Sequence, residues 1–241
     1  MATAEKNKTD VIQKLFSVGA HFGLIRSRRH PSAAPFIFGV KNRIEIFDLE
    51  KTSEALSRAK EFVKEQARAG GFVLFVGGKN EAQAAVREGA LSTGMPYVAG
   101  RWLGGTLTNF SEIKKRVARL EDLLSQKEKG ELAKYTKKER LLIDREIESL
   151  QISFSGLTPM KTLPRVLLAI DPRKESIAVR EARKLNIPIV ALASSDCDMN
   201  EIDYPIPGND SSKASIEFFV NEIVDAVNGG KKLMLALKEE K

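Results

Sequence analysis

The sequence predicts an α/β protein: a doubly wound parallel sheet into which an antiparallel helical hairpin is inserted. Short, continuous apolar runs recur along the chain, as in strands that are buried on both faces. Segments with helical spacing separate these runs, as the crossovers of a parallel sheet require. Residues 108–154 break the alternation with two successive apolar series spaced by four, three and four residues, which indicates two paired helices.

The N-terminal segment is predicted to contain a short helix, a basic loop and a strand pair. Residues 20–43 form the basic loop, and residues 36–40 and 43–49 alternate apolar and polar side chains around Lys41-Asn42. Such alternation on either side of a turn is typical of a β-hairpin. The apolar residues with helical spacing that precede the loop are Val11, Ile12, Leu15 and Phe16.

Strands and helices alternate through the rest of the sheet domain. The predicted strands are residues 71–76, 95–99, 165–170, 187–193 and the short extended piece 204–207. Asn80 is expected to cap a helix that ends near Leu91. Asp171-Pro172 is expected to start a second helix that ends near Leu185, because Asp caps helices and Pro fits the first turn.

A last helix is expected to follow the final strand. Asp210 or Ser211 is its predicted cap, and Gly229-Gly230 is predicted to stop it because glycine disfavours helix interiors. Residues 231–241 would then form a flexible tail.

The helical hairpin has its own start and stop signals. Asn109 is expected to open the first helix, Gly130 to interrupt it, and Thr136 with Glu139 to form a capping box for the second. The two seams are Ile113, Val117, Leu120 and Leu124, then Ile143, Ile147, Leu150 and Phe154. We expect a coiled-coil hairpin over residues 108–154 that projects from a sheet domain made of residues 1–107 and 155–230.

The composition predicts a cytoplasmic chain without membrane spans or disulfides. Of 241 residues 42% are apolar, and no apolar run approaches the roughly 20 residues of a membrane helix. Cys197 is the only cysteine, which excludes an intrachain disulfide and a zinc ribbon. Residues 1–9 lack the apolar stretch of a secretory signal.

Basic residues gather in residues 20–43. The formal net charge is +7, and this run contains five cations and no acid. The five are Arg26, Arg28, Arg29, Lys41 and Arg43. Because no carboxylate of the same run can neutralise them, a loop that contacts phosphate groups is favoured, with a solvated surface loop as the alternative.

No constellation of catalytic residues is recognisable. The two histidines, His21 and His30, have no identifiable nucleophile or base as a partner. Cys197 stands between Asp196 and Asp198, whose charges raise a thiol pKa and oppose nucleophilic chemistry. We interpret Cys197 as a small buried residue and predict that the chain is not an enzyme.

Nucleotide and metal sites are not supported by the motifs. Residues 77–80 lack the third glycine of a dinucleotide fingerprint, and residues 156–162 have Met160 where a P-loop has the glycine before its lysine. The acids of residues 196–203 lack calcium-loop spacing and are interpreted as a solvated loop. We expect no cofactor, metal or small-molecule substrate. A nucleotide-dependent enzyme and a free protein adaptor remain the rival hypotheses.

Residues 101–110 are the most unusual segment of the chain. Arg101 and Trp102 offer a charge beside a stacking face, a pairing that binds looped or single-stranded RNA. Thr106, Thr108 and Asn109 add donors close to a helix N-terminus, where backbone amides favour phosphate. A core position for Trp102 is the alternative.

This segment, Arg-Trp-Leu-Gly-Gly-Thr-Leu-Thr-Asn-Phe, closely resembles the signature of bacterial small-subunit ribosomal protein two. Further matches follow the family's order at residues 19–23, 36–39, 46–52, 74–77, 94–98 and 203–210. The resemblance implies a flavodoxin-like parallel sheet with a protruding coiled-coil hairpin, and no cofactor or activity. It also implies binding to small-subunit ribosomal RNA near the head–body junction, contact with neighbouring ribosomal proteins, and docking of ribosomal protein one.

The charges, the unusual segment and the resemblance together define the candidate RNA-binding residues. They are His21, Arg26, Arg28, Arg29, His30, Lys41, Arg43, Arg101, Trp102, Thr106, Thr108, Asn109, Lys114 and Lys115.

The chain departs from the family pattern at several positions. Leu24 replaces a histidine, Arg29-His30 replace Trp-Asn, and Gly78 replaces a threonine. The family's Gly-Gly-Leu-Pro-Asp becomes Lys-Thr-Leu-Pro-Arg at residues 161–165, which reverses a charge. These changes concern the protein-docking surface more than the fold.

Overall fold

The protein is built around a five-stranded parallel sheet. The computed structural model describes residues 2–239, with side chains described for residues 10–132 and 134–236. The strands lie in the order β5 (Tyr97–Val98), β4 (Val73–Val76), β6 (Val166–Ile170), β7 (Ile189–Ala193) and β8 (Tyr204–Pro207). Counted along the chain, this order is 2-1-3-4-5, the flavodoxin-like arrangement, so the predicted fold class is confirmed.

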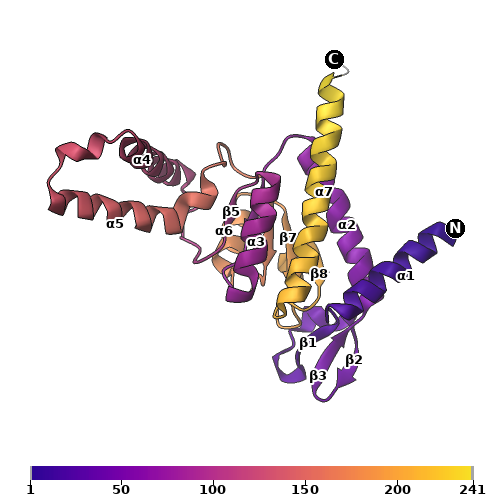
Figure 1. Cartoon of the computed structure of the whole chain (residues 1–241). Helices are drawn as coiled ribbons and strands as arrows, with labels where there is room; N and C mark the ends of the chain where they lie inside the picture. The colour runs from indigo at the N-terminus through magenta and orange to yellow at the C-terminus, as the bar shows by residue number, and fades with distance from the viewer. Residues whose placement is uncertain (1, 240–241) are drawn as a thin grey trace.

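Helices cover both faces of this sheet (Figure 1). One face carries α2 (Leu49–Arg68), α3 (Asn80–Thr93) and α7 (Lys213–Glu239), and the other carries α6 (Ser176–Lys184) and the base of the helical hairpin. Neighbouring strand residues therefore enter different cores: Leu74 packs in one and Phe75 in the other. Burial on both faces explains the continuous apolar strand sequences.

The sequence predicted that the basic run of residues 20–43 is a loop, but the structure shows strands and short helices there. After α1 (Ala2–Ser17), β1 (Phe22–Ile25) pairs with β3 (Ile44–Phe47), which also pairs with β2 (Ile37–Lys41) in a small antiparallel sheet of order β1-β3-β2. Residues between β1 and β2 form two short 3-10 helices. The loop prediction failed because the partner of β1 lies about twenty residues further along the chain.

The predicted β-hairpin within this run is confirmed. Strands β2 and β3 are joined by Asn42 and Arg43, both with positive φ, as a tight two-residue hairpin turn requires. The turn presents Lys41 and Arg43 to solvent at the tip of the small sheet.

The helical hairpin projects sideways from the sheet domain (Figure 1). Helices α4 (Phe110–Glu128) and α5 (Lys137–Phe154) pack through their apolar seams, with Leu120 and Ile147 buried. Gly130 adopts φ +72° where α4 ends, and Thr136 with Glu139 forms the predicted capping box.

The prediction that Gly229-Gly230 ends the last helix is wrong, because α7 continues to Glu239. A side-chain β-carbon on Gly230 would collide with the Lys64 carbonyl oxygen and lie 2.8 Å from Ala67 Cβ of α2. The glycine is therefore required for the close approach of two helices rather than for a stop. Residues 231–239 are helical instead of a loose tail.

Three predicted helix starts are also wrong by a few residues. Asn80 is the first helical residue and follows the cap position. Asp171 has φ +61° and opens a turn, so α6 starts only at Ser176. Helix α7 starts at Lys213, after the Asp210-Ser211 pair. Among residues 2–239, no helix combines the length and the apolar character that a membrane crossing demands.

Candidate nucleic-acid interface

Four of the predicted cations form an exposed basic rim on the small antiparallel sheet. Arg26 and Arg28 lie on the 3-10 helix that follows β1, and Lys41 and Arg43 flank the β2–β3 turn. In the described part of the chain, none of the four has a carboxylate within ion-pair distance. Their charges are therefore available to an anionic partner.

Arg29, the fifth cation, is already engaged. Its Nη1 lies 3.3 Å from Oε1 of Glu45, a completely buried carboxylate on β3 that accepts no well-aligned hydrogen bond. Removing Arg29 would leave this charge buried without compensation. Arg29 therefore has an internal partner, an acid two residues outside the acid-free run, and its phosphate contact stays a prediction.

The two histidines are half-buried and contact neighbouring side chains. His21 stacks on Phe16, with ring centroids 4.5 Å apart, and its ring is tilted against that of Phe22. Burial and the nearby charge of Lys41 lower the pKa of His21, which favours the neutral ring. His30 Nδ1 lies 2.8 Å from the Ser32 hydroxyl and 3.7 Å from Asp198.

The segment of residues 101–110 is organised by one carboxylate, Glu181 of α6. Its Oε1 accepts the Trp102 indole N–H at 3.2 Å and the Gly105 amide at 2.7 Å. Its Oε2 accepts the Leu107 amide at 2.9 Å, and the amide and hydroxyl of Thr108 at 3.1 and 3.2 Å. Of the donor residues that the sequence assigned to phosphate, Thr108 is therefore bonded to a group of the protein itself.

This geometry corrects two of the candidate residues. Trp102 is buried in the core, which confirms the alternative reading and excludes stacking on RNA. Thr106 is buried, and its hydroxyl donates to the Leu103 carbonyl at 2.7 Å. The Thr108 hydroxyl donates to Glu181, but the residue is exposed, so its contact with RNA stays a prediction.

The pKa of Glu181 agrees with its role as the charged acceptor for residues 101–110. Burial alone would raise the pKa of Glu181, but the amides of Gly105, Thr108 and Leu107 and the Trp102 indole lower it below the usual value. The residue is therefore a carboxylate near neutral pH, and it anchors the chain at the point where α4 begins.

The remaining candidates are exposed around the start of α4. Arg101 and Asn109 face solvent, and Arg101 has no ion-pair partner among the described residues. Lys114 lies over the Phe110 ring at 5.8 Å, and Lys115 forms an exposed ion pair with Glu112 at 2.6 Å. An exposed pair of this kind is weak, so Lys115 remains able to exchange its partner.

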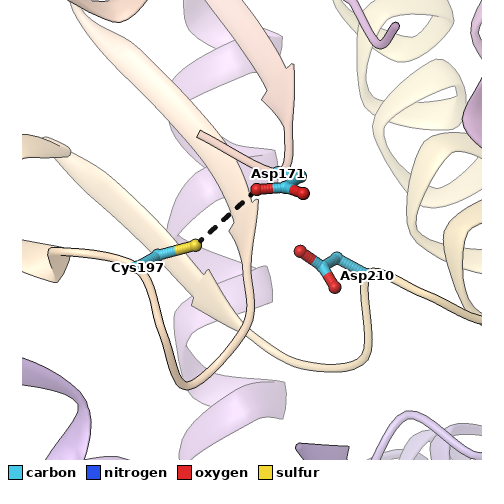
Figure 2. Close-up of side chains that lie close together, drawn as sticks. All are labelled: Asp171, Cys197 and Asp210. Carbon is cyan, nitrogen blue, oxygen red and sulfur yellow. Dashed lines mark hydrogen bonds between the residues drawn. The ribbon is translucent and has the colours of Figure 1, made fainter. Parts of the chain in front are cut away.

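A buried polar cluster lies at the carboxyl ends of the parallel strands (Figure 2). Lys79 Nζ lies 2.6 Å from Asp171 Oδ2 and 3.1 Å from Asp210 Oδ2. The Cys197 thiol points toward Asp171, 4.0 Å away. Burial and Asp171 raise the pKa of Asp210 to about 6, and burial together with the carboxylates raises the pKa of Cys197 far above its usual value.

This cluster suits an internal ion network better than a metal site. The Lys79 ammonium occupies the space between the two carboxylates and neutralises charge that a cation would need. A thiol with a raised pKa is also a poor ligand, because metals bind the thiolate. The predicted burial of Cys197 is confirmed.

The acidic run after β7 is only in part the solvated loop that was expected, because its exposed acids Glu201 and Asp203 also have partners within the protein. Asp196 pairs with Arg173 at 2.5 Å, and Glu201 pairs with Arg183 at 3.0 Å. Asp203 accepts the Ile189 amide at 2.9 Å. These carboxylates connect the segment between β7 and β8 to the loop before α6, to the end of α6 and to the start of β7.

Sequence reasoning missed Glu181, Arg173 and Lys174. Glu181 carries no local signal, since its partners lie more than 70 residues away in the chain. Arg173 and Lys174 follow directly after the Asp171-Pro172 strand end, and their position at the carboxyl edge of a parallel sheet was the available signal.

Comparison with known proteins agrees with this architecture. The family model described as Ribosomal protein S2 matches residues 15–230. The chain belongs to the ribosomal protein S2 family. It is a structural protein of the small ribosomal subunit and not an enzyme, as the sequence predicted.

Several curated relatives carry the name small ribosomal subunit protein uS2. The relative from Chloroflexus aurantiacus is 46% identical over 219 residues, which cover 91% of this S2 chain and 92% of the relative. The relative from Acidothermus cellulolyticus is 46% identical over 91% of this chain and 80% of its own. That from Rhodopirellula baltica is 43% identical over 92% of this chain and 85% of its own. The similarity thus includes the sheet and the hairpin.

Proposed function

We propose that this S2 protein supports assembly of the small subunit by binding small-subunit ribosomal RNA and neighbouring ribosomal proteins. It would act in the bacterial cytoplasm, where small subunits assemble. The observation that carries the proposal is the basic rim of Arg26, Arg28, Lys41 and Arg43, which has no compensating carboxylate among the described residues. Uncompensated cations on one surface are the electrostatic feature of a nucleic-acid contact.

Filter binding of the full-length protein to small-subunit ribosomal RNA tests this proposal. Affinity should fall steeply with added salt, because each neutralised phosphate releases condensed counterions. The triple variant Arg26→Ala, Lys41→Ala, Arg43→Ala should bind more weakly and with a shallower salt dependence. A matched control removes three exposed cations elsewhere: Arg58, Arg87 and Lys213. Salt-independent binding, or none even with earlier assembly proteins present, would contradict the proposal.

Contact with a neighbouring protein is a second part of the proposal, favoured by exposed apolar side chains on the same small sheet. Phe38 is 81% exposed and Val40, two residues along β2, is 49% exposed. Ribosomal protein one is the partner that the family resemblance implies. Phe38→Asp should weaken its capture by purified small subunits while S2 incorporation persists, and unchanged capture would argue against this surface.

A further inference from the structure

The carboxyl edge of the parallel sheet is hollowed at the point where the strand order reverses. β4 is the first strand of this sheet along the chain, and the next two strands, β5 and β6, pair with its two opposite edges. Doubly wound folds bind their ligands in the crevice at such a switch point. Two hollows of about 750 Å³ and about 270 Å³ lie at this edge, and Lys174 lines both of them.

Three cations from separate segments line this crevice without an ion-pair partner. Arg28 and Lys174 share the larger hollow, and Lys174 and Arg101 share the smaller one, so Lys174 lies between the other two. All three side chains are exposed, and none has a carboxylate within ion-pair distance in the part of the chain that the structure describes. Their charges therefore add.

The acids in the same walls cancel these charges only in part. Asp171 is paired with Lys79, and Asp196 is paired with Arg173 at 2.5 Å. Glu175 accepts the Gly78 amide at 2.9 Å. The two hollows are lined by four cations and three acids in all, so a positive net charge remains in the crevice.

The backbone excludes the nucleotide that this fold often binds. A nucleotide site at the end of β4 would present free amides to the phosphates, but the Gly78 amide is taken by Glu175. A side chain on Gly78 would also lie 2.6 Å from the Gly100 carbonyl oxygen, so the two loops close together here. A ligand of this crevice would therefore be bound by the separated side chains of Arg28, Lys174 and Arg101, and this arrangement suits an extended polyanion.

We infer that a strand of RNA crosses the carboxyl edge of the sheet and that Arg28, Lys174 and Arg101 contact successive stretches of its phosphodiester backbone. The inference rests on the proposed RNA-binding function and extends the RNA-binding surface from Arg28 of the basic rim to the edge of the parallel sheet. The end of β5 and the end of β7 are three strand spacings apart, roughly 14 Å at about 4.8 Å each. This span is longer than the distance between neighbouring phosphates of one strand, so the crevice can contact more than one of them.

Salt-dependent binding of the full-length protein tests the crevice. The crevice variant carries Arg28→Ala, Arg101→Ala and Lys174→Ala, and the control variant carries Arg58→Ala, Arg87→Ala and Lys213→Ala. Both lower the net charge by three, and all six side chains are exposed, so circular dichroism should show unchanged folds. The probes are small-subunit ribosomal RNA and a twelve-nucleotide oligouridylate.

The crevice variant should bind both probes at least tenfold more weakly, and its slope of log affinity against log salt should fall by about 2, at about 0.7 per lost phosphate contact. The control should retain the wild-type slope, and Lys174→Arg should bind like wild type. Equal losses in the two triple variants would overturn the crevice while leaving RNA binding intact. Absent binding by the wild type would overturn the proposed function itself. If polyglutamate competes with oligouridylate at equal charge, the site recognises acidic protein, and the RNA assignment is wrong.

Discussion

Glu181 is the residue on which the 101–110 segment depends. A single carboxylate accepts five hydrogen bonds there, four of them from residues 105–108. Hydrogen bonds to a charged group are worth more than those to a neutral one, and orphaned buried donors carry a full desolvation cost. The segment thus owes its conformation to one side chain that is distant in sequence.

Glu181→Ala should lower the free energy of unfolding by about 3 kcal/mol or more, because several buried donors lose their only acceptor. Urea denaturation at pH 7 measures this. Glu148→Ala, an exposed glutamate on α5, serves as the control and should change the value by less than about 0.5 kcal/mol. A loss of the same small size in both variants would show that the segment is held by other contacts.

The same residue predicts a pH dependence. Since the folded-state pKa of Glu181 lies below the ordinary value of 4.5, its contribution is fully present above that value. It is lost as the pH falls through the lowered pKa. The difference in urea midpoint between wild type and Glu181→Gln should therefore be largest near pH 7 and shrink below about pH 4. A difference that stays constant with pH would contradict an ionised Glu181.

Arg29 should behave as a structural residue. Arg29→Ala leaves Glu45 buried and uncompensated, which should destabilise the fold by about 2–3 kcal/mol. Adding Glu45→Gln should recover part of that loss, since the buried charge is then gone. Chemical denaturation of the single and the double variant measures both free energies of unfolding. If the double variant is less stable than Arg29→Ala alone, the pairing of Arg29 with Glu45 is disproved.

Local signals at the element scale were predictable, while contacts between distant elements were not. The Thr136 capping box and the paired seams follow from spacing within a few residues, and both are confirmed. The start of α6 was wrong because Asp171 is held by Lys79, about 90 residues earlier. The sequence alone allowed Trp102 to be either exposed or buried. It is buried with its indole N–H bonded to Glu181, a partner 79 residues away that no local pattern indicates.

Adjacent glycines in α7 should respond in opposite ways to alanine. Gly230→Ala should destabilise the protein by about 1–3 kcal/mol, because the new methyl group meets the backbone of α2. Gly229→Ala should stabilise it by up to about 1 kcal/mol, because its β-carbon would meet only the end of the flexible Lys64 side chain at 3.7 Å. Thermal and urea denaturation compare the two. Equal effects would mean that α7 does not approach α2 as closely as described.

At the scale of the whole molecule, the hairpin is joined to the sheet only through its base. Phe154, Leu157 and Trp102 share the core cluster of the sheet, whereas Arg119–Glu146 and Lys127–Asp144 pair α4 with α5. Replacing residues 121–145 by a short Gly/Ser linker should therefore shift the melting temperature by only a few degrees. Differential scanning calorimetry measures this, and a collapse of the sheet transition would show that the distal hairpin supports the sheet.

The hydrogen bonds between Glu181 and residues 101–110 fix the start of the hairpin within the protein itself. Because Glu181 accepts the backbone amides just before α4, the direction of α4 is set in the free protein. Under the proposed function, the hairpin would dock with its direction already fixed, so that little conformational entropy would be lost. Association with the subunit would then depend on diffusion and electrostatic steering rather than on folding at the RNA surface.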